Sequence, residues 1–288
     1  MKHTELARAI HLVDYGLKSP ASGYLPGYHR STTRATAGKL TGFTSLLYRM
    51  DPKNIDMVMT RRALSPVPLV RLYESKVAIT VAVLVDLSAS MGFVGRARKL
   101  AEAAKLAACL SYSAYRLGDR FMLVGFGDEV ELFFPPKRSP DYPWEIGAAL
   151  WEYQPTSKGV EGIRQACTLL PRHRSLVFLV SDFHFDGAIL ESVLAQLRRH
   201  DGVLVVLWDG AEGEDPLHVG WTALYDPETG ARTRRWLRSG LVARSRQAFQ
   251  ARRTRLLEAC RRVGADALWV QGAFDPVEMS RFFVSRRG

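Results

Sequence analysis

The stretch that most constrains the fold is residues 78–92, Ala-Ile-Thr-Val-Ala-Val-Leu-Val-Asp-Leu-Ser-Ala-Ser-Met-Gly. Seven of its first eight residues are apolar, which is typical of a strand buried on both faces of a parallel sheet. The run ends at Asp86, Ser88 and Ser90. In open α/β folds the loops at the carboxyl ends of the strands carry ligand sites. The stretch therefore predicts both the centre of a sheet and a candidate site.

A second apolar run, residues 176–180, ends in Ser181 and Asp182. Because parallel strands meet at one edge with their carboxyl ends, Asp86 and Asp182 are expected to lie together. A carboxylate with two hydroxyls suits a hard divalent cation, most plausibly Mg²⁺. The alternative is a capping role, in which Asp86, Ser88 and Ser90 accept hydrogen bonds from backbone amides at the start of the next helix.

The rest of the chain alternates strand and helix patterns. Helices are expected over residues 4–17, 96–117, 143–152, 160–170, 187–199, 241–263 and 276–284. Further strands are expected over residues 68–73, 120–126, 129–134, 203–207 and 267–270, with a late hairpin over 221–237. This alternation predicts an α/β fold with a doubly wound, mostly parallel sheet. We expect a basic N-terminal extension over residues 1–76 and a main domain over residues 77–288.

The Asp-x-Ser-x-Ser loop after a hydrophobic strand resembles the metal-ion-dependent adhesion site of von Willebrand factor A domains. Four other segments fall in the order seen in one bacterial family: residues 118–128, 134–136, 179–183 and 224–230. The family is domain-of-unknown-function family fifty-eight, the A-domain-like proteins associated with MoxR-type AAA+ ATPases. The resemblance covers roughly residues 28–272. It implies a von Willebrand factor A-like, Rossmann-like sheet.

The resemblance also implies a ligand set. Asp86, Ser88 and Ser90 would bind the metal directly, and Asp182 would bind it directly or through water. A third loop of the family supplies a threonine; here the aligned position holds Val160, which leaves Thr156 as the candidate. The family's Gly-Asp-Asp-x-Arg-x-Ile-Asp-Trp signature is reduced to its Ile-Asp pair, residues 55–56.

Such a site favours binding over catalysis. One or two carboxylates leave a divalent cation under-neutralised, so it attracts a carboxylate of a partner protein. Catalysis would need a base or nucleophile beside the metal. His184 is the nearest candidate, with a solvent-exposed loop histidine as the alternative. We expect no enzyme, and a metal-dependent hydrolase is the least favoured reading.

The charge distribution is uneven. Residues 77–230 carry 14 Lys and Arg against 20 Asp and Glu, whereas residues 231–288 carry 14 against 4. A basic segment suits an acidic partner or nucleic acid. We expect Arg244, Arg252 and Arg253, on the predicted helix 241–263, to dock onto an acidic ATPase surface. A nucleic-acid-binding module that uses the basic flanks is the alternative, although no recognition motif accompanies the charge.

Together these features predict a non-enzymatic adaptor or co-chaperone. The resemblance implies a MoxR-type AAA+ ATPase and a client protein as partners. It also implies a role in maturation or metal insertion of a client such as methanol dehydrogenase. The sequence has no apolar run near the roughly 18 residues of a membrane helix and no signal-peptide core, so the cytoplasm is expected. Three well-separated cysteines are expected to be buried and unpaired: Cys109, Cys167 and Cys260.

Overall fold

The computed structural model divides into two compact units. One comprises Met1–Gly16 with Thr80–Gly288, and the other comprises Leu17–Ile79. The described residues are 10–18, 26–30, 39–74, 76–94, 97–157, 159–208, 220–225, 232–237 and 239–286. The domain boundary expected between residues 76 and 77 lies close to Thr80, where the main segment of the larger unit begins. Residues 10–16 belong to this larger unit and not to the expected N-terminal extension.

A six-stranded sheet in the order β12-β9-β8-β5-β6-β7 forms the larger unit. Its strands are β5 (Thr80–Asp86), β6 (Arg120–Phe126), β7 (Val130–Lys137), β8 (Leu176–Ser181), β9 (Asp201–Trp208) and β12 (Asp266–Gln271). All neighbours are parallel except β6 and β7, which form an antiparallel pair at one edge. Every residue of β5, β8 and β9 is buried, as expected for central strands covered on both faces. The mostly parallel α/β fold is confirmed.

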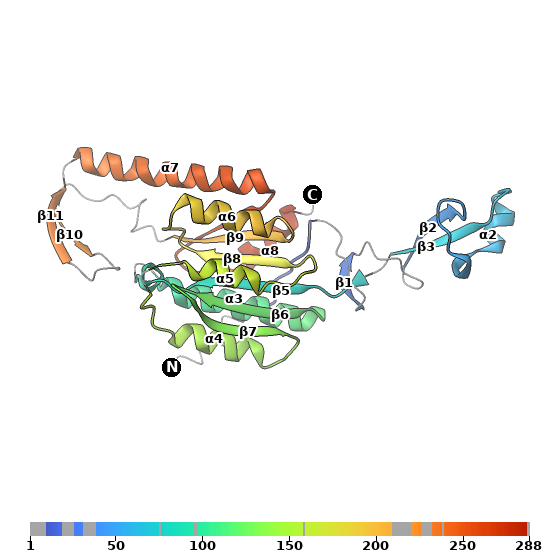
Figure 1. Ribbon diagram of the computed structural model, residues 1–288, viewed down its shortest axis with the longest axis horizontal. Helices are drawn as coiled ribbons and strands as arrows, with labels where there is room; N and C mark the ends of the chain where they lie inside the picture. The colour runs from blue at the N-terminus through green and yellow to red at the C-terminus, as the bar shows by residue number, and fades with distance from the viewer. Residues whose placement is uncertain are drawn as a thin grey trace. The chain divides into compact units, whose positions relative to one another are not determined.

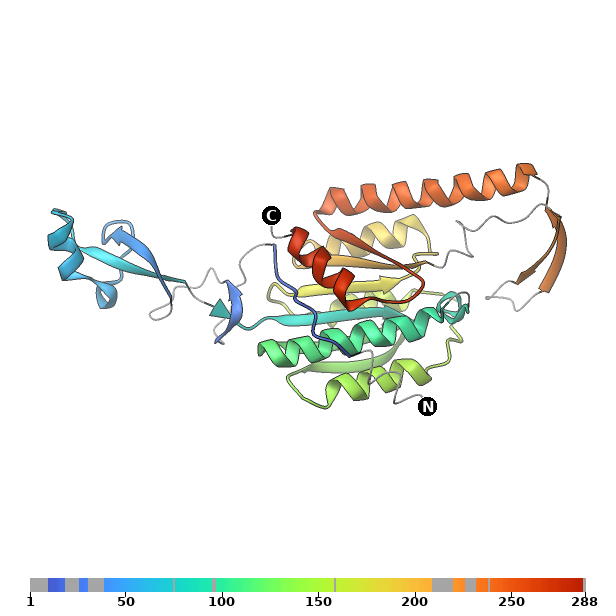
Figure 2. The ribbon, with the colours of Figure 1, turned by 180° about the vertical axis from the view of Figure 1, so that it is seen from behind.

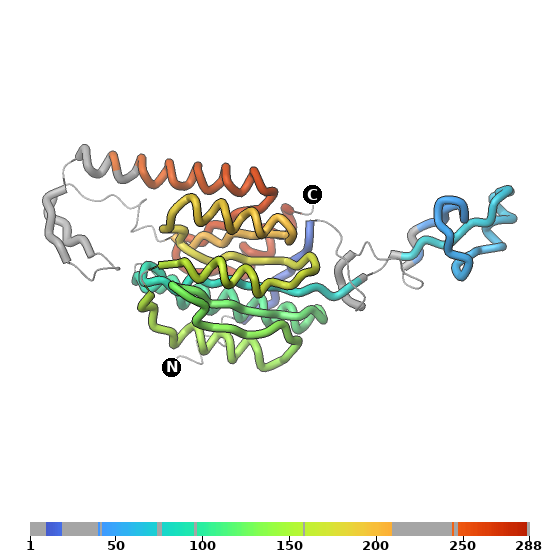
Figure 3. The backbone as a smooth tube through the Cα atoms, viewed as in Figure 1, coloured from blue at the N-terminus to red at the C-terminus, as the bar shows by residue number. Residues whose placement is uncertain are grey.

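Helices cover both faces of this sheet (Figures 1 and 2). One layer contains α5 (Gly162–Thr168), α6 (Gly187–Leu197) and α7 (Ser239–Val263); Figure 3 traces the backbone of all three, with α7 along the top of the view. The other layer contains α3 (Lys99–Leu117), α4 (Tyr142–Glu152) and α8 (Pro276–Arg286). Alternate residues of β5 serve the two layers: Ala82 and Leu84 belong to the core under α5, α6 and α7. On the other face the rings of Phe178 and Phe283 join β8 to α8, with centroids 5.9 Å apart.

The helix expected over residues 4–17 is wrong for its described part, because residues 10–17 are not helical. Val13 and Tyr15 are buried, whereas Leu12 and Asp14 are exposed, so burial alternates with a period of two. The backbone amide of Val13 donates to Ser113 Oγ at 2.8 Å. The segment runs along α3 and α8, as Figure 2 shows. Residues 4–9 lie outside the described part.

The smaller unit contains two antiparallel pairs. β1 (Pro26–Arg30) pairs with β4 (Lys76–Val77), and β2 (Lys39–Ser45) pairs with β3 (Leu69–Glu74). Asp56, from the retained Ile-Asp pair, caps α2 (Met57–Arg62) by accepting from the Met59 amide at 2.9 Å. The same carboxylate binds Arg71 on β3 at 2.8 Å. Asp56 therefore has a structural role in tying helix to strand.

The late hairpin consists of β10 (Gly220–Tyr225) and β11 (Arg232–Leu237), and its expected turn lies outside the described residues. Two short 3-10 helices are also present, η1 (Pro52–Asn54) and η2 (Ala89–Gly92). The three cysteines are buried free thiols, as expected. Among the helices of the described ranges, none combines the length and apolar character needed to cross a bilayer.

Candidate functional site

The register of β5 and β8 brings the two acidic strand ends together. Val85 pairs with Val180, so Asp86 and Ser181 follow as the next residues of adjacent parallel strands. Ser181 Oγ donates to Asp86 Oδ2 at 2.6 Å. Asp86, Ser181 and Asp182 are all completely buried. The predicted convergence at the carboxyl edge is therefore present, but beneath the surface.

The loop after β5 closes over Asp86. The Ser88 backbone amide donates to Asp86 Oδ1 at 2.8 Å. The hydroxyl oxygens of Ser88 and Ser90 lie 3.1 Å apart, and η2 begins directly after Ser88. Asp86 thus binds the backbone of its own loop, but neither η2 nor α3 has a side-chain capping hydrogen bond at its N-cap residue, so the capping alternative holds only for this one contact of Asp86.

Lys99 is the residue of this site that sequence reasoning missed. Its ammonium binds Asp182 Oδ2 at 2.8 Å, and the side chains of Lys99 and Asp182 are only 4% and 1% exposed. The nitrogen also lies 5.5 Å from the centroid of the Phe93 ring, where a cation–π contact adds to its stabilisation. A buried cation therefore already lies among the predicted metal ligands.

A helical pattern could have revealed Lys99. It lies on the same face of α3 as Ala103, Leu106 and Leu110, at positions i, i+4, i+7 and i+11, and these three residues are fully buried. A lysine that continues an apolar stripe must bury its charge or find a partner. The sequence shows this conflict, but it does not show which acid resolves it.

The two carboxylates have opposite pKa shifts. Burial, together with the charge of Asp182, raises the pKa of Asp86 above its ordinary value. Burial acts in the same direction on Asp182, but the Lys99 ammonium, His184 and the Ser90 hydroxyl together outweigh burial and lower the pKa of Asp182. Asp182 is thus held as the charged partner of the pair with Lys99.

The third loop reaches the site through its backbone. Ala89 donates its amide to the Ser157 carbonyl at 2.8 Å, and Ser88 and Ser157 form a parallel bridge. The side chain of Thr156 is exposed, and Val160 is buried in the apolar core. The structure brings together four of the five predicted ligands: Asp86, Ser88, Ser90 and Asp182. The fifth, Thr156, is exposed. Its neighbour Ser157 makes the backbone contacts with Ser88 and Ala89 instead.

An open hollow of ≈ 220 Å³ lies beside this loop. It is lined by Met91, Gly92, Arg98, Leu100, Tyr153, Gln154 and Pro155. Its volume is below the roughly 300–1,000 Å³ of small-molecule sites. On one side, Glu131 accepts hydrogen bonds from the Tyr153 and Ser157 hydroxyls, which ties the loop to β7.

The predicted partner-binding arginines differ in availability. Arg252 is exposed and lies 3.2 Å from His184 Nδ1, which links α7 to the edge of the site. Arg244 is also exposed. Arg253 is half-buried over the Trp269 ring, 5.1 Å from its centroid. Arg252 and Arg244 are therefore the better candidates for an external contact.

The arrangement does not fit a divalent cation as it stands. Each of the four oxygens of Asp86 and Asp182 accepts a hydrogen bond within the chain, from Ser88, Ser181, Lys99 and the amide of His184. A metal bound directly to Asp182 Oδ2 would have to compete with the Lys99 ammonium for this oxygen. Among the described residues no group of three or more His, Cys, Asp or Glu side chains is arranged to hold a metal ion.

Comparisons with known proteins agree with the family resemblance. Residues 51–256 match the family described as "Protein of unknown function DUF58". A relative from Paracoccus denitrificans, described as an uncharacterized protein in the moxR 3' region, is 39% identical over 85 residues, which is 27% of this chain and 81% of that protein.

Solved structures with a similar fold are more distant in sequence. The conserved hypothetical protein BatB from Bacteroides thetaiotaomicron is 14% identical, with a TM-score of 0.47 over 73% of this chain and 98% of its own. The SpRpn10 VWA domain is 10% identical, with a TM-score of 0.40 over 74% and 98%. A mussel byssus protein, proximal thread matrix protein 1 with a zinc-occupied MIDAS motif, is 14% identical, with a TM-score of 0.42 over 73% and 47%. On the family match, which spans more than half of its length, the chain belongs to the DUF58 family.

Proposed function

We propose that the chain is a non-enzymatic adaptor or co-chaperone that works with a MoxR-type AAA+ ATPase. The Paracoccus denitrificans relative is described by its place in the moxR 3' region, and this supports a functional link to such an ATPase. The ATPase supplies the work, and this chain recognises a client protein. Maturation of a client enzyme such as methanol dehydrogenase, including metal insertion, is a branch of this proposal with which the sequence is compatible, and the cytoplasm is its proposed compartment.

The observation that carries the proposal is the internal satisfaction of the acidic edge. All four carboxylate oxygens of Asp86 and Asp182 hold donors from the chain itself. His184, the histidine that the sequence places next to the edge, is in contact with Arg252. General base catalysis needs a group within reach of substrate and free to take a proton. Because these carboxylates are buried as well as bonded, the arrangement argues against a reaction centre at this edge and equally against direct docking of a partner carboxylate there. The groups that a partner can reach are the exposed Arg244 and Arg252 on α7.

Two surfaces suit a protein partner. The smaller unit exposes large apolar side chains, and contiguous exposed apolar surface often marks an interaction site. These side chains are Leu40, Leu47, Tyr48, Met50, Met57, Val58 and Leu64. In the larger unit, exposed arginines of α7 supply positive charge beside the acidic edge, which favours association with an acidic partner.

The test uses the purified chain and the purified MoxR-type ATPase from the same organism, with binding measured by biolayer interferometry. We expect the double variant Arg244→Glu/Arg252→Glu to bind at least about tenfold more weakly. Arg261→Glu is the matched control, because Arg261 is exposed on the same helix but lies at its other end. Equal affinity for all three proteins would remove α7 from the interface, and no binding by the unmodified chain would remove the ATPase as partner.

The sequence also predicts a magnesium ion at the acidic edge, where the Lys99 ammonium already binds Asp182. The same measurement with and without EDTA tests whether docking depends on this ion.

Nucleic-acid binding is the second candidate, favoured by the exposed arginines of α7. It requires retention of duplex or single-stranded DNA at low salt, with a steep loss of affinity as salt rises.

A further inference from the structure

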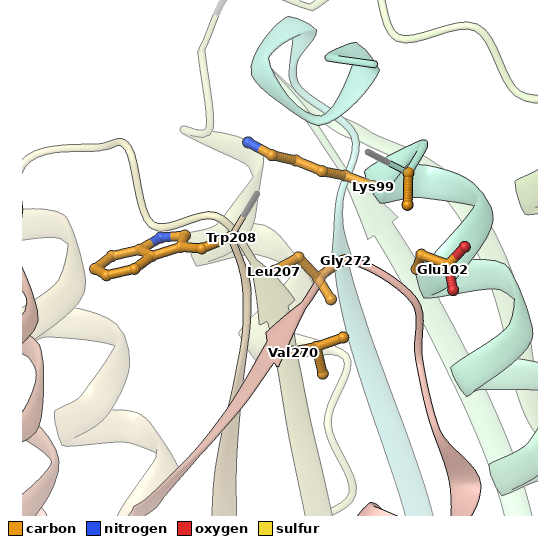
Figure 4. A pocket seen from close by; sticks show the side chains of 7 residues that line it. Lys99, Glu102, Leu207, Trp208, Val270 and Gly272 are labelled. Atoms are coloured by element: carbon orange, nitrogen blue, oxygen red, sulfur yellow. The ribbon is translucent and has the colours of Figure 1, made fainter. Parts of the chain in front are cut away.

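The Lys99 side chain spans the carboxyl edge of the sheet. Figure 4 shows it leaving the first turn of α3 and passing above Leu207 and Val270, with its nitrogen at the far end, away from Glu102. Beneath it is a cavity of ≈ 10 Å³ lined by Ala97, Lys99, Glu102, Leu207, Trp208, Val270 and Gly272, room for about one water molecule at most. The stem therefore lies over apolar strand ends while the ammonium reaches the acids.

Hydrogen bonds hold both the side chain and the backbone of Asp182, the partner of the Lys99 ammonium, in place. Asp182 is completely buried and receives Lys99 at 2.8 Å on one oxygen and the His184 amide at 3.2 Å on the other. The Trp208 indole donates to the Asp182 carbonyl at 2.8 Å, which holds the backbone of this residue in place. Because both the side chain and the main chain are held, Asp182 is positioned for an ammonium.

A divalent ion and this ammonium cannot share the edge. Mg²⁺ needs a near-ideal shell of oxygens at about 2.0–2.1 Å, and Lys99 occupies one face of Asp182 at hydrogen-bond distance. A divalent ion bound to the same carboxylate would lie close to the Lys99 ammonium, and two like charges this close repel each other strongly where water is excluded. Asp86 would then be the one carboxylate left for the metal, and its two oxygens are held in place by the Ser88 amide and the Ser181 hydroxyl.

We infer that Lys99 is the resident cation of the Asp-x-Ser-x-Ser edge, and that it takes the place of a divalent metal there. The chain then carries a von Willebrand factor A-type edge that is held together without metal. Any partner that docks at this edge does so by a metal-independent contact. Replacing Lys99 by an apolar side chain leaves two buried carboxylates without their cation and creates an oxygen site for a divalent ion.

The experiment measures Mn²⁺ binding to the isolated full chain by electron paramagnetic resonance, so its result does not depend on any partner. We expect the unmodified chain to bind no stoichiometric Mn²⁺ up to about 1 mM, the weak end of protein oxygen sites. Lys99→Met, which keeps much of the stem, gains a site at least about tenfold tighter. Adding Asp182→Asn abolishes this gain.

Lys105→Met is the matched control, because Lys105 is on the same helix but binds Glu102 instead; it binds Mn²⁺ like the unmodified chain. Stoichiometric Mn²⁺ in the unmodified chain below 1 mM overturns the inference, and this arm is decisive even if Lys99→Met does not fold. A folded Lys99→Met chain, with unchanged circular dichroism, that gains no Mn²⁺ site also overturns it.

Discussion

Removing the Lys99 ammonium should destabilise the larger unit strongly. The pair with Asp182 is 2.8 Å long, and its two side chains are 4% and 1% exposed. Breaking a buried pair from one side leaves an uncompensated charge and costs about 3–5 kcal/mol. At roughly 2–4 °C per kcal/mol for a unit of this size, Lys99→Met should lower Tm by about 6–20 °C. The exposed pair Arg164–Glu161, 3.9 Å long, should lose at most about 0.5 kcal/mol in Arg164→Ala.

The assay is urea unfolding followed by tryptophan fluorescence. All six tryptophans lie between residues 144 and 269, within the larger unit, so the signal reports that unit. A double-mutant cycle with Lys99→Met, Asp182→Asn and the double variant isolates the interaction. The double variant should be clearly more stable than the sum of the single effects predicts, since it leaves no lone charge. A single-variant cost below about 1 kcal/mol, or full additivity, would refute the assigned pairing.

The pH dependence of the same variant has a defined sign. The pKa of Asp182 is lower in the folded chain than its ordinary value, because Lys99, with His184 and Ser90, stabilises the carboxylate by more than burial destabilises it. The stability that comes from the charged pair is therefore complete above the ordinary carboxyl pKa of about 4, and it is lost as pH falls through the folded pKa. We expect the difference between the unmodified chain and Lys99→Met to narrow below about pH 4. A constant difference across this range would contradict the assignment.

Three further outcomes are expected. Tyr15→Phe removes a phenol that donates to Asp119 at 2.6 Å in the core; it should cost about 1.5–3 kcal/mol in urea unfolding, and a cost below about 0.5 kcal/mol would contradict this contact. Gly162→Ala places a Cβ 2.4 Å from main-chain atoms and Gly187→Ala meets nothing within 4 Å, so only the first should lower stability, by about 1–3 kcal/mol; equal effects would contradict the clash. Burial raises the pKa of all three cysteine thiols to about 11 or 12. Iodoacetamide at pH 8 should therefore label the cysteines slowly in the native chain and fully in the urea-unfolded chain. Rapid labelling of the native chain would contradict the burial of the thiols. These thiols are Cys109, Cys167 and Cys260.

Strong local patterns made the main fold predictable. The apolar runs that became β5 and β8 could not be exposed on either face, and the small, regularly spaced apolar residues of α3 end at Gly118, whose φ of 81° suits a helix terminus. Residues 10–17 mislead because Val13 fits a helical spacing and an alternating one equally well. The contacts with α3 and α8 select the extended form, and those helices are about a hundred residues or more away in the chain.

The candidate site was predictable only as a location. Asp86 and Asp182 end two strands of one parallel sheet, and the geometry of such sheets is enough to place both acids at the same edge. The roles of their oxygens depend on groups that local patterns do not identify. Thr156 and Ser157 are adjacent in the sequence, yet Thr156 is exposed and Ser157 bridges to Ser88, because the path of the loop decides which residue faces the site.

The order of strands and helices, the burial of the central strands and the acidic ends of β5 and β8 follow from the sequence alone, because hydrophobic periodicity and chain connectivity act over short distances. The identity of the cation at the edge was decided only by the tertiary structure. Lys99 and Asp182 are 83 residues apart, and a charge is matched by whichever partner lies within a few ångströms after folding. The short distance between the Lys99 ammonium and Asp182 arises when α3 packs on the sheet beside β5. An acid that looks like a metal ligand in the sequence is therefore part of a buried ion pair in the structure.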